Sequence, residues 1–169
     1  MTQSIIELHS RGFVHLDIKL ENFILTDKKQ IKLIDFGTTH KITDYEKKLQ
    51  TISGTRGYSA PEIYRKSYHN NSDIWALGIC IWVLLVRTYC FNHKNLDHKY
   101  KFNNFPENKF YFPSKKHIDV MNKYDFNFEL RNLFNEIFKI FPLDRCSLKY
   151  IYYFDFEKNY KFELTDRKK

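Results

Sequence analysis

Cysteine, glycine and proline are scarce in this chain of 169 residues, which has three Cys, five Gly and four Pro. Three irregularly spaced Cys cannot form a disulfide framework, and an odd number favours a reducing compartment. No apolar run is long enough to cross a bilayer as a helix, and the longest, from Ile74 to Val86, predicts a buried core helix. The first residues lack the basic start and apolar core of a signal peptide. We therefore expect an intracellular, cytoplasmic protein without a membrane partner.

Acidic residues are the scarcer of the two charge classes, with 20 Asp and Glu against 28 Lys and Arg, for a net charge of +8. Such an excess can indicate binding to nucleic acid or to an anionic membrane. Here the basic residues are scattered Lys pairs interleaved with acids, such as Lys47-Lys48 and Lys115-Lys116. No recognition motif accompanies them. We therefore expect no nucleic-acid partner, and a basic nucleic-acid-binding protein is an alternative that only the charge supports.

Local patterns predict several helices and one small β-hairpin. Two short runs rich in Ile, Leu and Phe, 23–25 and 31–34, flank a polar turn and predict the two strands of the hairpin. The long polar stretch 38–57 predicts a loop, and long loops in small domains are commonly functional. Apolar spacing predicts helices at 4–11, at 73–88 and within 126–154.

The helix predicted over 73–88 is apolar on every face, so we expect neighbouring elements to cover it completely. Ser72 and Asp73 are residue types that commonly cap helices, and they stand at its start. The stretch 90–124 is poorly patterned and predicts loops with one short helix at most. From residue 157 to residue 169 the tail is charged, and we expect it to be frayed.

Four short motifs follow one another in the first half of the chain. They are His-Leu-Asp-Ile-Lys-Leu-Glu-Asn at 15–22, Asp-Phe-Gly at 35–37, Ala-Pro-Glu at 60–62 and Asp-Ile-Trp-Ala-Leu-Gly at 73–78. Each motif alone is a weak signal, because short triplets recur by chance in turns. In this order and spacing they resemble the C-terminal lobe of a eukaryotic protein kinase domain of the Ser/Thr type.

This resemblance implies an α+β fold, a mainly helical lobe over residues 1–156 with a small β-hairpin that bears the active-site loops. Within it the catalytic loop would be 13–22, the activation segment 35–62, the core helix 73–88 and the closing helices 126–154. The resemblance also implies a transferase that uses ATP and Mg²⁺ to phosphorylate Ser or Thr of a protein substrate.

Three side chains would act on the protein substrate. Asp17 matches the catalytic-loop Asp of the family, which orients the acceptor hydroxyl and accepts its proton. Lys19 matches the Lys that neutralises the transferring phosphate. Thr55, in Gly-Thr-Arg-Gly-Tyr at 54–58, would hydrogen-bond Asp17 and Lys19 and orient them. The combination of Lys19 and Thr55 is typical of kinases that act on Ser and Thr rather than Tyr.

The nucleotide and its metal ion would be held by residues on either side of the predicted hairpin. Asn22 and Asp35 match the two Mg²⁺ ligands of the family, and their hard oxygen atoms suit that ion. Lys19 would also contact the phosphate, and Ile24 matches a residue that packs under the adenine ring. Because Asp17 lies in the loop before the hairpin and Asp35 follows it directly, we expect these two carboxylates at the same end of the hairpin.

Other motif residues match scaffold positions of the family rather than catalytic ones. Glu62 and Arg145 match a buried ion pair that ties the activation segment to the helices. Asp73 matches a residue that holds the backbone of the catalytic loop. His15 and Phe36 match part of a hydrophobic stack that links the two lobes of active kinases.

Leu16 departs from the family pattern, because an Arg usually stands between the His and the Asp of the catalytic loop. That Arg normally receives the phosphate of a phosphorylated activation loop. Without it, a phosphate on Thr51 or Ser53 has lost its best-known partner. We therefore expect that any activity does not require phosphorylation of this loop.

The chain also lacks a Gly-x-Gly-x-x-Gly loop and a Val-Ala-Ile-Lys-like strand before Asp17. In a kinase these segments cover the phosphates and belong to the N-terminal lobe, so we expect negligible activity from this chain alone. A catalytically inactive pseudokinase-like fragment that serves as a protein-binding module is therefore the alternative. A truncated or degenerate gene product is a further one.

A second constellation, of Cys90, His93 and His98 with Cys80, has a spacing that could suggest a metal site. Cys80 belongs to the apolar helix, however, and the chain has no second Cys pair. We therefore expect no metal ion at these residues.

Overall fold

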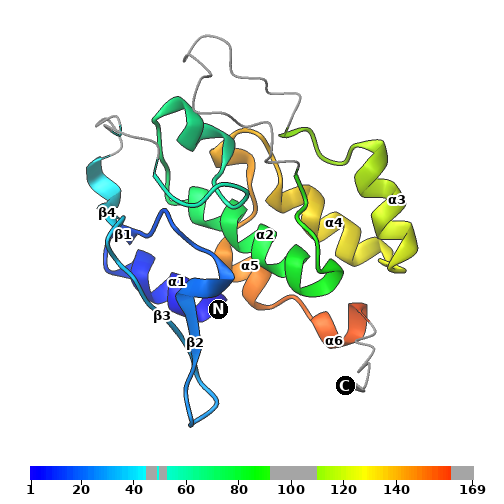
Figure 1. Ribbon diagram of the computed structural model, residues 1–169, viewed down its shortest axis with the longest axis horizontal. Helices are drawn as coiled ribbons and strands as arrows, with labels where there is room; N and C mark the ends of the chain where they lie inside the picture. The colour runs from blue at the N-terminus through cyan, green and yellow to red at the C-terminus, as the bar shows by residue number, and fades with distance from the viewer. Residues whose placement is uncertain (45–48, 50–52, 92–109, 161–169) are drawn as a thin grey trace.

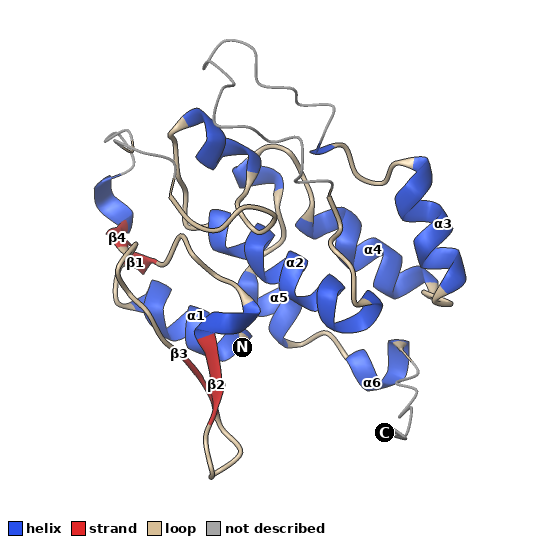
Figure 2. Cartoon of the chain, in the orientation of Figure 1, coloured by secondary structure: helices blue, strands red, loops and turns tan. Residues whose placement is uncertain are grey.

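Helices account for most of the regular structure in the computed structural model, which describes residues 1–44, 49, 53–91 and 110–160 (Figures 1 and 2). The helices are α1 (Thr2–Ser10), α2 (Ser72–Val86), α3 (Lys115–Lys123), α4 (Phe128–Ile137), α5 (Leu148–Tyr152) and α6 (Phe156–Asn159). The strands are β1 (Phe13–Val14), β2 (Phe23–Leu25), β3 (Ile31–Leu33) and β4 (His40–Lys41). They form two antiparallel pairs, β1 with β4 and β2 with β3. The predicted α+β, mainly helical fold is thus confirmed.

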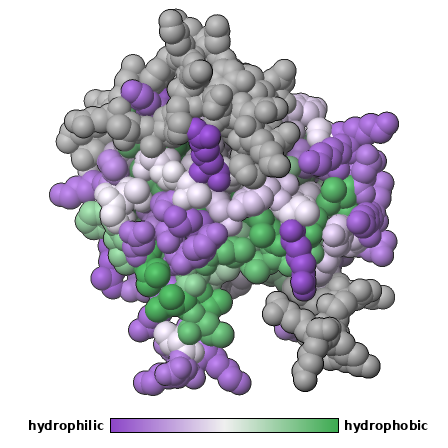
Figure 3. All heavy atoms as spheres, in the orientation of Figure 1, coloured by the Kyte–Doolittle hydropathy of each residue, from purple (hydrophilic) through white to green (hydrophobic). Residues whose placement is uncertain are grey.

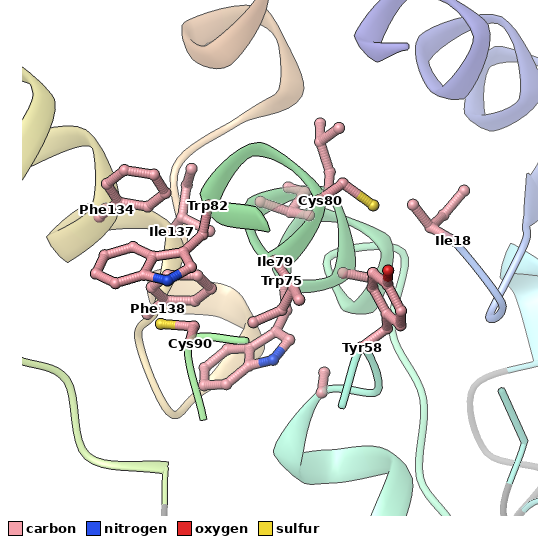
Figure 4. Close-up of a cluster of buried hydrophobic side chains, with 14 of the residues drawn as sticks. Ile18, Tyr58, Trp75, Ile79, Cys80, Trp82, Cys90, Phe134, Ile137 and Phe138 are labelled. Atoms are coloured by element: carbon pink, nitrogen blue, oxygen red, sulfur yellow. The ribbon is translucent and has the colours of Figure 1, made fainter. Parts of the chain in front are cut away.

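Helix α2 lies at the centre of the hydrophobic core (Figure 4). Trp75 stacks on Phe91, with ring centroids 5.0 Å apart, and Trp82 meets the ring of Phe134 edge-on at 5.2 Å. Burial of such large aromatic side chains dominates the stability of a core. The expectation that α2 is covered on every side is wrong near its C-terminus, because Leu84 is 56% exposed.

The start of α2 differs from the prediction that Ser72 and Asp73 cap it. Both residues are the first two residues of the helix, and the N-cap position is Asn71, whose side chain makes no capping hydrogen bond. Ser72 Oγ accepts from the amide of His69 and donates to the carboxylate of Glu62. Neither side chain caps the helix, because the hydroxyl of Ser72 binds Glu62 and the carboxylate of Asp73 binds the catalytic loop.

The β2–β3 hairpin projects from the helical body (Figure 1). Its register pairs Phe23 with Leu33 and Leu25 with Ile31, which agrees with the two predicted strands. At the base of the hairpin, the amide of Ile34 donates to the carbonyl of Asn22 at 2.9 Å. This hydrogen bond continues the pairing toward the end of the catalytic loop and holds the two ends of the hairpin together.

A second strand pair, β1 with β4, is absent from the sequence-based prediction because each strand has only two residues. Phe13 pairs with Lys41 and Val14 with His40. The pairing joins the first residues of the catalytic loop to the activation segment. It therefore brings together two segments whose side chains would have to meet in an active site.

Helix α3 is a short helix within the stretch 90–124, of which residues 92–109 lie outside the described part of the chain. In its capping box the backbone amide of Ser114 donates to Nδ1 of His117, whose Nε2 donates to the carbonyl of Cys90 at 2.8 Å. Burial lowers the pKa of His117, which keeps the ring neutral near pH 7. The sequence offered no partner for this histidine, because Cys90 is 27 residues away.

The frayed tail expected from residue 157 is wrong for its first residues. Asp155 caps the short helix α6, and Tyr160 donates its hydroxyl proton to the carbonyl of Leu85 at 3.1 Å. The ring of Tyr160 also meets Phe126 edge-on, at 5.7 Å between ring centroids. Residues 161–169 lie outside the described part of the chain.

Among the described residues, no helix combines the length and the apolar character that a membrane span requires. The longest described helix, α2, has 15 residues. A membrane-spanning helix needs about 20.

Replacing Arg87 by Gly is expected to stabilise the protein by up to about 1 kcal/mol. Arg87 follows α2 as its C-cap with φ 59° and ψ 20°, a left-handed conformation that disfavours residues with a Cβ. Its exposed side chain makes no hydrogen bond or ion pair within the described chain. Thermal unfolding measures the effect, and Arg87→Ala, which keeps the Cβ, should not reproduce it; an equal gain from both variants would contradict this explanation.

Candidate active site

The catalytic loop passes through a strained turn just before Asp17. Leu16 has φ 65°, a value that costs an L-residue other than Gly about 1–2 kcal/mol. The carboxylate of Asp73 accepts the two consecutive amides that lead into this turn, from His15 at 2.8 Å and from Leu16 at 2.9 Å. Asp73 therefore holds the loop backbone, as the resemblance predicts.

The carboxylate of Asp17 is held by three donors from two segments of the chain. Thr55 donates its hydroxyl proton to Oδ1 at 2.6 Å, and Lys19 Nζ donates to Oδ2 at 2.8 Å. Asn22 Nδ2 also approaches Oδ2, at 3.3 Å. Lys19 Nζ in turn donates to Thr55 Oγ1 at 2.9 Å, so the predicted contacts of Thr55 are present. The arrangement fixes the orientation of the Asp17 carboxylate, which keeps 11% of its side-chain surface exposed.

Asn22 links Asp17 to the base of the hairpin. Its side-chain amide donates to the carbonyl of Asp17 at 2.8 Å, and its own backbone carbonyl accepts the amide of Ile34, the residue before Asp35. Within the described chain its Oδ1 accepts no hydrogen bond. The loop before the hairpin ends at Asn22, and the loop after the hairpin begins at Asp35. Both loops therefore lie at the same end of the hairpin.

Asp35 presents an exposed carboxylate from a left-handed backbone conformation, with φ 62°. The only hydrogen bond to this carboxylate in the described chain is a long one, 3.4 Å from the amide of Gly37. The side chains of Asn22 and Asp35 thus offer an amide oxygen and carboxylate oxygens as metal ligands. Within the described chain, no strong hydrogen bond occupies these oxygens. Mg²⁺ fits such a set, because it takes one or two protein oxygens and fills its other positions with water and phosphate.

His15 connects the catalytic loop to the residues around Asp35. Its Nδ1 accepts the amide of Asp17 at 3.3 Å, so its Nε2 carries the proton and donates to the carbonyl of Ile34 at 3.2 Å. The ring meets Phe36 edge-on at 5.5 Å, and the His15 carbonyl accepts the hydroxyl of Thr38. These contacts fix the position of the segment that carries Asp35 relative to the loop that carries Asp17.

An apolar surface lies on the hairpin beside these residues, above its polar tip (Figure 3). Ile24 and Phe36, which the resemblance assigns to the nucleotide and to the hydrophobic stack, are both exposed. A groove of about 770 Å³ is lined by residues of α1 and β3, and its apolar side chains include Leu8, Ile31 and Phe36. Exposed apolar area of this kind commonly marks a binding surface.

Leu16, which stands where the family has an Arg, is buried in the core with 5% of its surface exposed. The activation segment packs closely against it, because a Cβ on Gly54 would overlap the Leu16 carbonyl. An apolar side chain there offers no charge to a phosphate. Thr51, one of the two predicted phosphorylation positions, lies outside the described residues.

Two contacts near the site were not found from the sequence. His9 of α1 binds the Asp73 carboxylate, with Nε2 2.9 Å from Oδ2. Tyr58 meets Tyr89 edge-on at 5.6 Å, and burial, followed by a hydrogen bond with Tyr89, raises the pKa of Tyr58 well above its usual value. Both contacts join residues that are distant in the chain, and only a search for partners of the buried Asp73 could have suggested His9.

The described residues give no support to a metal site built from Cys80, Cys90, His93 and His98. Burial raises the pKa of the Cys90 thiol far above its usual value, so the metal-binding thiolate is disfavoured. In the described ranges, no three His, Cys, Asp or Glu residues gather as a metal site would require. His93 and His98 lie outside these ranges.

Comparison with known proteins gives one consistent result. A family model described as "Protein kinase domain" matches residues 1–156. Curated relatives include a probable cell cycle serine/threonine-protein kinase CDC5 homolog of Encephalitozoon cuniculi, 37% identical over 88% of this chain and 30% of its own length. An Aurora kinase of Eremothecium gossypii is 33% identical over 88% of this chain, and the serine/threonine-protein kinase Nek1 of Mus musculus is 34% identical over 85%.

This chain covers 37% of the length of the Aurora kinase and 11% of that of Nek1, so it spans well under half of each of these relatives. The match nevertheless includes all four motifs and the two loops that meet at Asp17. The chain therefore belongs to the protein kinase family.

Proposed function

We infer that this chain carries the substrate side of a Ser/Thr protein kinase active site and serves the transfer of the terminal phosphoryl group of ATP to Ser or Thr of a protein. The observation that carries this inference is the triangle of Asp17, Lys19 and Thr55, with contacts of 2.6–2.9 Å. It unites two segments more than thirty residues apart in the chain. Phosphoryl transfer depends chiefly on such positioning and on charge stabilisation.

In this function Asp17 orients the acceptor hydroxyl and takes its proton as the oxygen bonds to phosphorus and ADP leaves. Lys19 faces the charge on the transferring group, because its ammonium is held beside Asp17 by Thr55. Asn22 and Asp35 would hold Mg²⁺, which neutralises phosphate charge when bound. Ile24 would offer an apolar contact to the adenine.

The metal site can be tested in the 169-residue chain without measuring turnover. Mn²⁺, a paramagnetic substitute for Mg²⁺, should selectively broaden the amide resonances of Asn22, Asp35 and Gly37, and excess Mg²⁺ should reverse the effect. Asp35→Asn removes a charged ligand and should weaken binding by at least about tenfold.

Asp27→Asn is the matched control for this test, because Asp27 is an exposed carboxylate in the hairpin turn. It should leave the broadening unchanged. Equal broadening in Asp35→Asn and the original chain, or none near Asn22 and Asp35, would contradict the proposal and favour the protein-binding module. Asp17→Asn is the inactive control for any assay of labelled phosphate transfer from ATP to a Ser/Thr peptide.

A further inference from the structure

We propose that Arg56 and Arg87 select the protein substrate, and that they favour a Ser or Thr acceptor flanked by Asp or Glu. Both arginines are exposed, and neither makes a hydrogen bond or ion pair within the described part of the chain. The inference rests on the proposed function, because it names the class of substrate at that site. It can be tested by peptide binding in the absence of nucleotide, metal ion and turnover.

Arg56 lies at the corner of a tight turn that begins at Thr55. The amide of Tyr58 donates to the carbonyl of Thr55 at 3.1 Å, which closes a turn of four residues. Gly57 has φ 88°, as the third residue of a type II turn does, so Arg56 occupies the second position. The hydroxyl of Thr55 binds Asp17 at 2.6 Å. An acceptor hydroxyl placed at Asp17 therefore brings the neighbouring substrate residues close to Arg56.

The charge of Arg56 is available to a substrate. Its electrostatic neighbour in the described chain is Tyr64, and burial raises the pKa of that hydroxyl, which stays neutral near pH 7. The adjacent carboxylate of Asp17 is already paired with Lys19 at 2.8 Å. An unpaired guanidinium presents a fork of donors that matches the two oxygens of a carboxylate.

The contact between Tyr58 and Tyr89 brings Arg87 to the same part of the surface. The two rings meet edge-on at 5.6 Å, and they join the activation segment to the loop that follows α2. Each arginine precedes one of these tyrosines by two residues, which is a backbone length of at most about 7 Å. One extended peptide can therefore reach both guanidinium groups.

The backbone conformation of Arg87 supports a role outside the fold. With φ 59° and ψ 20°, this position disfavours any residue with a Cβ, and glycine would be relaxed there. A residue held in such a conformation is more common at functional sites than elsewhere. The side chain of Arg87 contributes no described hydrogen bond or ion pair to the fold, so its charge is free to bind a partner.

Glu21 is the acidic side chain that opposes this preference. It is exposed at the end of the catalytic loop, and its carboxylate lies close enough to Tyr58 to act on the pKa of that hydroxyl. Glu21 should therefore repel an acidic peptide that the two arginines attract. Removing its charge should have the opposite effect to removing the charge of either arginine.

NMR titration of the 169-residue chain measures the selection. The probes are a nine-residue peptide with a central Ser and Glu on both sides of it, and the same peptide with Gln in place of every Glu. The Glu peptide should bind about tenfold more tightly at low ionic strength, because each exposed charge pair contributes at most about fivefold. It should shift the amide resonances of Thr55, Gly57 and Tyr89, and its advantage should shrink in 0.5 M NaCl.

The variants assign the preference to particular charges. Arg56→Gln and Arg87→Gln should each reduce the advantage of the Glu peptide by about threefold, whereas Glu21→Gln should increase it. Arg87→Gly should lose as much of the advantage as Arg87→Gln although it raises the thermal stability, which a merely structural role would not produce. Lys32→Gln is the matched control, because Lys32 is exposed on β3 and has no described ion pair.

Three results would each overturn the proposal. The first is equal affinity for the two peptides, including the absence of binding by both at millimolar concentration. The second is an equal loss in Lys32→Gln and in the arginine variants, and the third is a set of shifted resonances that excludes Thr55 and Gly57. The Mn²⁺ test reports on Asn22 and Asp35 without any peptide, so either experiment can fail while the other succeeds.

Discussion

Replacing Arg145 by Met should destabilise the protein by about 3–5 kcal/mol, because it leaves the Glu62 carboxylate buried without its partner. The guanidinium binds both carboxylate oxygens of Glu62 at 2.7 Å and donates its remaining N–H groups to the carbonyls of Asn71, Lys139 and Ile140. All five donors are thus used. Chemical denaturation of the single variant, followed by circular dichroism, measures the loss.

Two further variants identify the cause of this loss. Arg145→Lys should restore little, because an ammonium cannot reproduce the fork of donors. Combining Arg145→Met with Glu62→Gln should cost less than the sum of the two single changes, because the buried charge is then absent.

The exposed pair of Glu7 and Arg11 provides a control, and Arg11→Met should cost at most about 1 kcal/mol. Similar losses from Arg11→Met and Arg145→Met would contradict the assignment of the larger cost to burial.

Replacing Gly78 by Ala should destabilise the protein by about 1–3 kcal/mol, although alanine is the better helix former. Gly78 lies where α2 crosses the end of α4. A Cβ on this residue would overlap Cγ2 of Ile137 and lie 3.0 Å from Cε1 of Phe138. Both neighbours are buried, so neither can move aside freely. The midpoint of thermal unfolding measures the change.

A double variant tests whether this overlap is the cause. Ile137→Ala alone removes buried methyl groups and should destabilise by about 2–5 kcal/mol. Combined with Gly78→Ala it should cost less than the sum of the two, because the new methyl group occupies part of the space that Ile137 leaves. Strict additivity would show that the two residues do not compete for space.

The elements that could be predicted are those with a local pattern of their own. The hairpin has two short apolar strands around a polar turn, and both strands form with the predicted residues facing each other. The apolar run that forms α2 was recognisable because a continuous run of this length must be buried. The short pairs of β1 and β4 have no such pattern, because two residues carry no periodicity.

Errors arose where the packing of distant parts of the chain, rather than a local preference, decided the surroundings of a side chain. Asp73 suits a helix cap by its type, yet its carboxylate accepts amides from the catalytic loop, 57 and 58 residues away. Leu84 continues the apolar run of α2, but no described element covers it. Tyr160 lies in a charged tail, yet its docking against Phe126 and Leu85 orders the first residues of that tail.

The sequence by itself determined the family and the chemical types at the site, because Asp17, Lys19, Asn22 and Asp35 stand in motifs of recognisable order and spacing. Only the tertiary structure decided the contacts that no motif indicates, such as that of His9 with Asp73 and that of Tyr58 with Tyr89. The physical reason is that hydrogen bonds act over about 3 Å in space. A linear pattern records which groups are available, whereas packing of the whole chain determines which of them meet.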